Sequence, residues 1–271
     1  MVVELWWEVM AEEDTGRRRR GALSVIFNRR SIRRYKRTPI SDEIVRLILE
    51  AGQRAPCIYQ SYTVIQITDT KLRSELTRIF DDKLIEEAPV LLLLCIDLLR
   101  TSRMFSAITP DHVLTSRDHP IETVESLIEL GMFLSNAITA AEILGLGSVI
   151  LDYPLRTCRE VTSLLGLPKG VIPVVFLCVG VPNERPPPRP RLPIGLIYSK
   201  DRYAEVRNED LINHLKEASE KLRLEGYIEK YGGLKGVSYM EYLRDKIRID
   251  KAAMKDINSV SHFLQENGLK I

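Results

Sequence analysis

"RRSIRRYKRTPISDEIVRLILEAGQRAP", residues 29–56, decides how this chain is interpreted, because a dense basic run leads directly into an amphipathic helix. Six arginine or lysine side chains fall within residues 28–37. Beyond them, Ser41 is placed to cap a helix that begins with two acids, and acids favour the positive end of a helix dipole. Gly52 is placed to end that helix. Three interpretations of the basic run are open: a solvated surface, a contact for nucleic acid, or a pocket for one small phosphate.

The composition is that of an ordinary globular protein. Of 271 residues, 45% are hydrophobic, and the formal net charge is only +2, so the basic run is a local feature. The longest apolar stretch, residues 88–99, is shorter than the roughly 20 residues that a membrane-spanning helix needs. We therefore expect neither nucleic acid nor a membrane among the partners.

The four cysteines lie far apart in the sequence and form no CxxC pair. Neither a disulfide framework nor a metal site is therefore expected, and a reducing, cytoplasmic location is the default. Cys57 is interpreted either as a redox-active thiol or as an inert small residue. His112 and His119 either contact substrate or face solvent. The arginines at 17–20 repel one another and are expected to be solvated, with binding of an anionic partner as the alternative.

Hydrophobic periodicity predicts strands separated by helices. The expected strands are 62–68, 90–96, 148–151 and 172–180, and the expected helices are 22–28, 41–52, 69–80, 121–144 and 157–166. The run 90–96 is apolar throughout, which is typical of a strand covered on both faces. Residues 100–120 show no periodicity and are expected to form a loop. The inward face of the 41–52 helix is expected at Ile44, Leu47, Ile48 and Ala51.

The sequence also changes character along its length. We expect a charged leader at 1–21, a main domain at 22–200 and a charged, mostly helical extension at 201–271. Capping boxes are expected at 157–160 and 238–241. The proline-rich segment 182–193 is expected to be extended and exposed.

Two groups of arginines are suited to a phosphate monoester. The planar guanidinium donates two parallel hydrogen bonds, which matches phosphate better than an ammonium does. The first group is Arg29, Arg30 and Arg33, together with the hydroxyl of Ser31. The second is Arg189 and Arg191, spaced by two on an extended segment so that both can point the same way. Taken alone, the first group is also compatible with a solvated surface, and the second with a linker.

Three segments taken together resemble one family. They are residues 29–56, quoted above, "ELGMFLSNAITAAEILGLGSVIL" at 129–151 and "VTSLLGLPKGVIPVVFLCVGVPNERPPPRPRLP" at 161–193. In order and separation they are similar to the nitroreductase-like FMN-dependent oxidoreductases, over roughly residues 22–200. The resemblance implies an α+β nitroreductase-like fold with a central mixed, mostly antiparallel sheet flanked by helices. It also implies an intertwined homodimer with FMN bound at the interface.

The resemblance carries over a set of cofactor-binding positions. Arg29 and Ser31 would face the phosphate, Arg33 would approach the pyrimidine edge of the flavin, and Gln60 stands where the family commonly has Asn. The segment 147–151 would lie along the isoalloxazine ring near N5. The full expected set is Arg29, Arg30, Ser31, Arg33, Gln60, Gly147, Ser148, Val149, Ile150, Leu151, Arg189 and Arg191. No side chain is expected to act as a catalytic group, because the flavin carries the chemistry.

The implied reaction is a ping-pong transfer of hydride from NADH or NADPH, through flavin N5, to a nitroaromatic, quinone or similar planar acceptor. The loop at 57–64 departs from the family pattern, with Tyr62, Thr63 and Val64 in place of Gln-Pro-Trp. Other flavin reactions on the same fold therefore stay open, namely reductive dehalogenation, flavin destruction or dehydrogenation. A non-catalytic FMN-binding protein and a nucleic-acid-binding protein are the alternatives from other classes.

Overall fold

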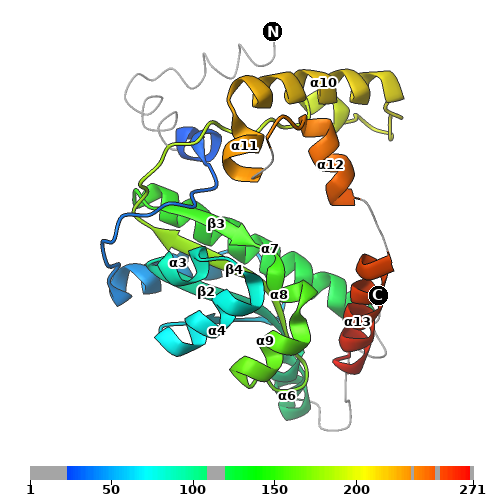
Figure 1. The fold of residues 1–271 in the computed structure, drawn as a ribbon. Helices are drawn as coiled ribbons and strands as arrows, with labels where there is room; N and C mark the ends of the chain where they lie inside the picture. Colours follow the sequence, from blue (N-terminus) through cyan, green and yellow to red (C-terminus); the bar gives the residue numbers. More distant parts are fainter. Residues whose placement is uncertain (1–22, 109–119, 233–234, 248–250, 269–271) are drawn as a thin grey trace, which may run out of the picture. The chain divides into compact units, whose positions relative to one another are not determined.

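The computed structural model describes residues 23–108, 120–232, 235–247 and 251–268 (Figure 1). The leader at 1–21, with Arg17 to Arg20, and the loop histidines His112 and His119 lie outside these residues. By their contacts the residues divide into two compact units. Unit 1 comprises Met1–Pro186 and Lys255–Ile271, and unit 2 comprises Pro187–Met254. The units are therefore described separately.

Unit 1 is built on a four-stranded sheet in the order β1-β2-β4-β3. The strands are β1 (Tyr62–Gln66), β2 (Val90–Asp97), β3 (Gly147–Leu151) and β4 (Val171–Gly180). All three pairings are antiparallel. The mixed sheet implied by the resemblance is thus antiparallel among the described strands, and parallel pairing is limited to an isolated bridge between Ser31 and Ser148.

The central strand β2 confirms the expectation of burial on both faces, since all eight of its residues are buried. Its side chains alternate between two cores. Leu92, Leu94 and Ile96 belong to one apolar cluster, whereas Leu91 and Leu93 belong to the other. A strand with a period of two needs a covering layer on each side to produce this pattern.

Helices supply those two layers (Figure 1). The first cluster contains buried residues of α3 (Asp42–Gln53) and α7 (Pro120–Ile143), together with Phe263 of α13 (Lys251–Glu266). The second contains residues of α4 (Thr70–Phe80), α5 (Leu84–Glu87) and α9 (Cys158–Leu165), and Tyr153 of the short α8 (Tyr153–Arg156) packs against it. The result is a sheet between two helical layers.

Helix α3 begins as expected, with the Ser41 hydroxyl accepting a hydrogen bond from the Ile44 amide at 3.4 Å. Its buried face differs from the expected one: Val45 and Ile48 are buried, whereas Leu47 is 47% exposed. The four expected positions included a residue that points away from the core, and Val45 takes its place.

Two expectations for other helices were wrong. Helix α6 (Leu98–Ile108) occupies the start of the region expected to be a loop, because it continues directly from β2 and buries Leu98 and Thr101 against the core. At the start of α9, the Thr157 hydroxyl donates to the Tyr153 carbonyl at 3.0 Å and does not cap the helix. The preceding helix α8 provides that carbonyl, which the sequence pattern did not reveal.

Helix α7 is apolar on more than one side. Its segment Ile121–Ile143 is long and apolar enough to cross a membrane. Of the 18-residue stretch of this segment that meets that criterion, 44% is buried within the protein. Leu130, Phe133 and Ala137 contribute to the first core cluster. We interpret α7 as a core helix of unit 1, with further apolar side chains on its outer surface.

Unit 2 is helical. It contains a 3-10 turn at Ile194–Leu196, α10 (Asn208–Leu224), α11 (Tyr227–Gly232) and α12 (Tyr239–Ile247), around a small core that includes Leu222 and Ile228. The capping box expected at 238–241 is confirmed. The Ser238 amide donates to Glu241 at 2.8 Å, and the Glu241 amide donates to the Ser238 hydroxyl at 3.2 Å. Residues 183–193 contain neither helix nor strand, as the prolines predicted.

Candidate functional site

The basic run is held in an extended conformation against one end of the sheet. After the helical residues 23–28, the Ile32 amide donates to the Ser148 carbonyl at 2.9 Å, and the Lys36 amide donates to the Val181 carbonyl at 2.8 Å. The Arg33 amide donates to the carboxylate of Glu184 at 2.7 Å. The backbone of the run is therefore fixed by β3 and by the segment that follows β4.

Tyr35 fastens the same segment from within. Its hydroxyl lies 2.7 Å from the Ile32 carbonyl and 3.2 Å from the Cys178 carbonyl, to which it donates. Burial raises the pKa of Tyr35 well above its usual range. A phenol that is buried and hydrogen-bonded in this way stays neutral, so it serves as a structural anchor.

Two glycines allow the basic run to lie so close to the sheet. A Cβ atom on Gly147 would lie 2.5 Å from Cγ1 of Ile32, and one on Gly180 would lie 2.8 Å from the ring of Tyr35. A side chain at Gly147 would therefore press on Ile32, and one at Gly180 would collide with both Pro89 and Tyr35. Gly147 was predicted for close approach to a ligand; in the structure, Ile32 fills the space beside it.

A cavity of about 420 Å³ opens beside β3. Five residues of the predicted set line it, namely Arg29, Ser31, Ser148, Val149 and Ile150. Residues of α7, including Leu134 and Ile138, form an apolar wall. The cavity therefore combines a guanidinium, four hydroxyl-bearing residues (Ser31, Ser135, Thr139 and Ser148) and apolar surface, which is the make-up expected of a site for a ligand with an anionic group and an apolar body.

Buried polar atoms around this cavity lack partners. The Ser148 hydroxyl, Nε of Arg30 and Oε1 of Glu142 are buried without a hydrogen-bond partner. Such groups are costly unless something satisfies them. Ser148 and Glu142 line the cavity itself. The guanidinium of Arg29 and the hydroxyls of Ser31 and Ser148, the latter buried without a partner, fit a phosphate-bearing ligand.

Glu142 places an acid among these basic groups. Burial raises the pKa of its carboxyl group, while the charges of Arg29 and Arg30 act in the opposite direction and only partly offset that effect. The charge on Glu142 is therefore easier to neutralise than that of an exposed glutamate.

Other predicted positions lie apart from this cavity. Arg33, Gly147 and Leu151 are neighbours of lining residues but do not line it themselves. Gln60 lies beside a second cavity, of about 360 Å³, lined among others by Tyr62 and Arg100. Within one chain, the structure therefore does not bring Gln60 to the cavity of Arg29.

Arg189 and Arg191 belong to unit 2. The Arg189 guanidinium lies over the ring of Tyr227, 5.4 Å from its centroid. Nη1 of Arg191 donates to the Pro190 carbonyl at 3.1 Å. Their side chains thus make local contacts within that unit, on the extended proline-rich segment.

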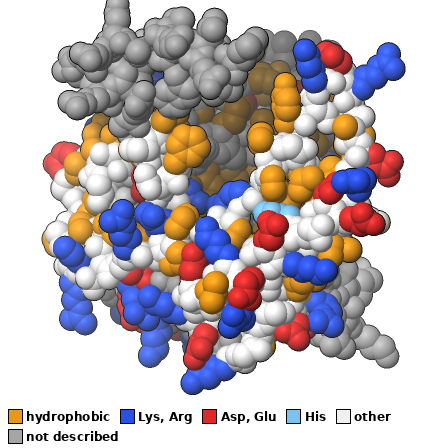
Figure 2. All heavy atoms as spheres, turned by 90° about the horizontal axis from the view of Figure 1, so that it is seen from above, with side chains coloured by type: hydrophobic (Ala, Val, Ile, Leu, Met, Phe, Trp, Pro, Cys, Tyr) orange, Lys and Arg blue, Asp and Glu red, His pale blue; other side chains and the backbone are white. Residues whose placement is uncertain are grey.

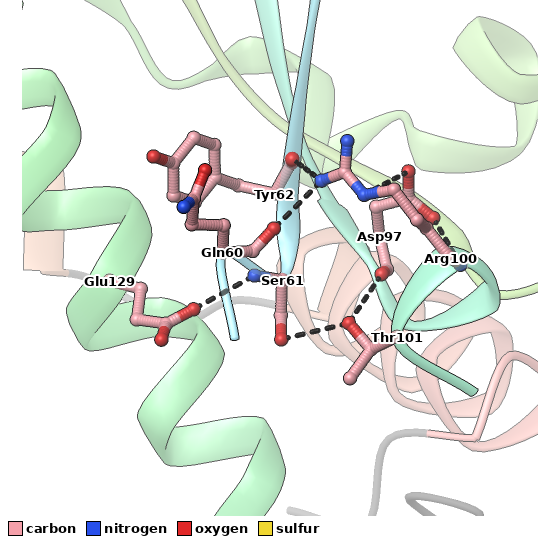
Figure 3. A network of polar contacts seen from close by, with 7 residues as sticks. All are labelled: Gln60, Ser61, Tyr62, Asp97, Arg100, Thr101 and Glu129. Atoms are coloured by element: carbon pink, nitrogen blue, oxygen red, sulfur yellow. Dashed lines mark hydrogen bonds and ion pairs between the residues drawn. The ribbon is translucent and has the colours of Figure 1, made fainter. Parts of the chain in front are cut away.

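The sequence analysis missed Glu129, a buried carboxylate of α7. It accepts hydrogen bonds from the backbone amides of Ile58, Tyr59 and Ser61, the last two at 2.8 Å. Figure 3 shows the contact with Ser61. Only 3% of Glu129 is exposed. The available signal was an acid within an apolar stretch, "LIELGMF" at 127–133, where a charge needs a buried partner.

The cysteines are all free. Burial raises the pKa of Cys95 and of Cys178 to about 12, and it also raises the pKa of Cys158. Cys57, in contrast, is exposed. Among the described residues, no group of histidine, cysteine and acidic side chains is arranged to hold a metal ion.

Tyr153 follows β3 and points into the second core rather than toward the cavity. Its ring stacks on Phe80 with centroids 5.4 Å apart, and its hydroxyl donates to Asp82 at 3.2 Å. Burial, together with the negative charge of Asp82, raises the pKa of Tyr153 to about 12.

Comparison with known proteins agrees with this architecture. The profile described as "Nitroreductase family" matches residues 26–181. The chain is 30% identical to a NADPH-flavin oxidoreductase of Vibrio harveyi, over 70% of this chain and 77% of that protein. It is also 30% identical to an FMN reductase [NAD(P)H] of Bacillus subtilis (strain 168), over 73% of this chain and 79% of that protein.

Among solved structures, the hypothetical oxidoreductase YcnD from Bacillus subtilis superposes with a TM-score of 0.80 at 26% identity. The superposition covers 92% of this chain and 98% of that one. Because 92% of 271 residues is more than 200, the likeness continues into the helical C-terminal part.

Proposed function

The chain belongs to the nitroreductase family, and from that premise we propose that it is an NAD(P)H-dependent FMN oxidoreductase that reduces a planar acceptor. The observation that carries the proposal is the cavity beside β3, where Arg29, Ser31 and the unpartnered hydroxyl of Ser148 meet an apolar wall. The relatives named for NADPH-flavin and FMN reduction support the same cofactor.

In this proposal Arg29 and Ser31 bind the phosphate of FMN. A guanidinium donates two hydrogen bonds to phosphate oxygens, and the backbone contacts of Ile32 keep both side chains in place before the ligand arrives. Arg30 lies in the same run, and the family resemblance also assigns phosphate contacts to Arg189 and Arg191. Pre-organisation of this kind lowers the entropic cost of binding.

The segment 147–151 is proposed to lie along the isoalloxazine ring, with Arg33 near its pyrimidine edge. A cation there stabilises the negative charge that develops on reduction. FMN, when bound, supplies the redox chemistry: it accepts hydride from NAD(P)H and passes it to the acceptor. Ile150, which is 42% exposed, provides apolar cavity surface, and no protein nucleophile is needed.

The basic run is better suited to this compact ligand than to a nucleic acid. Arg29 lines a concave cavity, and the backbone of the run is bound to the sheet. On the face shown in Figure 2, basic side chains lie interspersed with acidic and apolar ones. Nucleic-acid binding favours a continuous basic surface.

The proposal includes a homodimer. Ile121, Val124 and Ile128 follow one face of α7 and are 66%, 55% and 54% exposed. Phe27, in the helical residues 23–28, is 78% exposed. A second copy would cover this surface and would explain why α7 is apolar both toward its own core and away from it. It also offers Gln60 a place beside a flavin, in the cavity of the other copy.

The acceptor is proposed to be a nitroaromatic, a quinone or a similar planar electrophile, reduced in a ping-pong cycle in the cytoplasm. The donor is NADH or NADPH. Since the fold alone does not set the substrate, the altered loop at 57–64 keeps reductive dehalogenation or dehydrogenation as the second candidate.

The decisive experiment is a visible spectrum of the purified protein, followed by anaerobic addition of NADPH or NADH. A flavin spectrum that bleaches on addition and returns with menadione or nitrofurazone supports the proposal. A colourless protein that does not take up added FMN contradicts it. A bound flavin that neither nucleotide reduces identifies a non-catalytic FMN-binding protein.

A further inference from the structure

We propose that Glu129 is a positioning residue, which holds the loop at residues 57–61 rigid so that Gln60 is presented to the flavin in the second copy of the chain. This inference rests on the proposed function. Its structural part depends only on contacts within unit 1, and Figure 3 shows those of Glu129 with Ser61 and of Arg100 and Thr101 with residues 60–62.

The loop is held by its backbone. The Glu129 carboxylate accepts three amide hydrogen bonds, one oxygen binding Ile58 and Tyr59 and the other binding Ser61 at 2.8 Å. Consecutive amides that converge on one anion form a nest. Here the anion is a side chain of α7, so the loop is tied to the longest helix of the core.

A second set of contacts comes from α6. Nη2 of Arg100 donates to the carbonyls of Gln60, at 2.7 Å, and of Tyr62. The Thr101 hydroxyl donates to the Ser61 hydroxyl at 3.0 Å (Figure 3). Helix α7 therefore accepts hydrogen bonds from the amides of the loop, and helix α6 donates hydrogen bonds to its carbonyls.

Although its backbone is fastened, the loop exposes its side chains. Ile58 is 62% exposed, and Cys57 and Gln60 are exposed as well. Gln60 has φ of 54°, in the left-handed region that is unfavourable for a residue with a side chain. A strained backbone under exposed side chains persists only where surrounding contacts enforce it.

Burial of the Glu129 carboxyl group costs desolvation free energy. A buried carboxyl group is costly unless its oxygens accept hydrogen bonds, and here three backbone amides donate to them. A solvent-facing loop without a function would not need a buried charge beneath it. The arrangement is explained if the loop must keep one conformation at a site where ångström-scale placement matters.

The test is Glu129→Gln in the full-length protein. The amide retains the size of the side chain but removes the charge and replaces one acceptor oxygen by a donor. The matched control is Glu75→Gln, the same change at an exposed residue of α4, where the lost contact is a surface pair with Arg78. Amide hydrogen exchange at residues 58, 59 and 61 should accelerate at least about tenfold in Glu129→Gln and stay unchanged in the control.

In the FMN-loaded enzyme, Glu129→Gln should retain one FMN per chain, because the phosphate contacts are elsewhere. Its flavin absorption maximum and reduction potential should shift, and kcat should fall by about tenfold. Glu129→Asp, which keeps the charge on a shorter arm, should recover part of each change. A Glu129→Gln enzyme with wild-type exchange, spectrum, potential and kcat would overturn the inference.

Failure of the proposed function is distinguishable, since it appears as absent flavin in the wild-type protein, while the exchange measurement needs no flavin. If Glu129→Gln does not fold, Arg100→Lys tests the same loop from α6. Lysine cannot reproduce the contacts of the guanidinium with two carbonyls, and the loop amides should again exchange faster. Unchanged exchange and flavin spectrum in Arg100→Lys would then contradict the inference.

Discussion

The amide of Ile32 donates a 2.9 Å hydrogen bond to the carbonyl of Ser148, and this contact joins the basic run to the edge of the sheet. Ile32 has its side chain against Gly147, whereas its neighbour Ser31 faces the cavity. Ile32 therefore holds the run against the sheet, and the neighbouring Ser31 is available to a ligand. The alternation follows from the period of two in extended chain.

Removal of two arginines that we propose to bind the phosphate of FMN should leave the purified protein mostly without cofactor. Each charge-assisted hydrogen bond contributes about 1.5–3 kcal/mol, so Arg29→Ala combined with Arg191→Ala should weaken FMN binding by about 10²-fold or more. The flavin-to-protein ratio after purification and an FMN titration measure the change. The matched control is Arg34→Ala with Arg37→Ala, which removes the same charge from exposed positions and should retain the flavin. Full retention in the first double variant would show that the phosphate lies elsewhere.

Gly147→Ala should destabilise unit 1. The new Cβ would meet the branched side chain of Ile32 at 2.5 Å, and overpacking of this kind costs about 1–3 kcal/mol. Chemical denaturation measures the loss. Gly195→Ala is the control, because nothing lies within 4 Å of the Cβ it would introduce, and it should change stability by less than about 0.5 kcal/mol. Equal stability of the two variants would mean that residues 31–33 shift without cost.

A charge on the outer face of α7 should dissociate the proposed dimer. Ile128→Glu places a carboxylate at a side chain that is 54% exposed in one chain. In a buried interface it would be desolvated without a partner, so the protein should sediment as a monomer at micromolar concentration and lose FMN. Ile128→Val keeps the surface apolar and should sediment as wild type. A dimeric Ile128→Glu protein would place the interface on another surface.

The free energy of unfolding should fall at alkaline pH, in part because of the ionisation of Tyr153. Its pKa is about 12 in the folded protein, above the ordinary value of 10 for a tyrosine. Between these values the unfolded chain releases a proton that the folded protein keeps, so the contribution of Tyr153 is complete below pH 10 and disappears as the pH rises through 12. Tyr153→Phe should therefore lose stability less steeply between pH 10 and 12. A parallel decline in both proteins would exclude this role of Tyr153.

Local sequence patterns predicted the elements of unit 1 well. The unbroken apolar run of β2 and the cap at Ser41 have short-range causes, and both are present. The start of α6 and the role of Thr157 were missed, because each depends on the preceding element. Continuation from β2 and the carbonyl of Tyr153 decide them.

The candidate site was predictable where the residues are close in sequence or joined by strand pairing. Arg29, Ser31 and Ser148, three of the positions that the resemblance assigned to the cofactor, line one cavity, and their contact with FMN stays a prediction. Glu129 was not predicted, because its partners are backbone amides some seventy positions earlier. Nearly every residue has such an amide, so the sequence does not indicate which ones bind the carboxylate. Gln60 was placed by analogy, and only the structure shows that its own chain carries it away from that cavity.

The distribution of thiols allows one site of the natural protein to be labelled selectively. Cys57 is the exposed cysteine, while Cys95, Cys158 and Cys178 lie in the interior with suppressed ionisation. A maleimide dye or nitroxide added to the unaltered protein will therefore attach at the border of the loop that Glu129 holds. Its spectrum can follow the approach of a nucleotide or an acceptor in real time, with no engineered cysteine to disturb the fold.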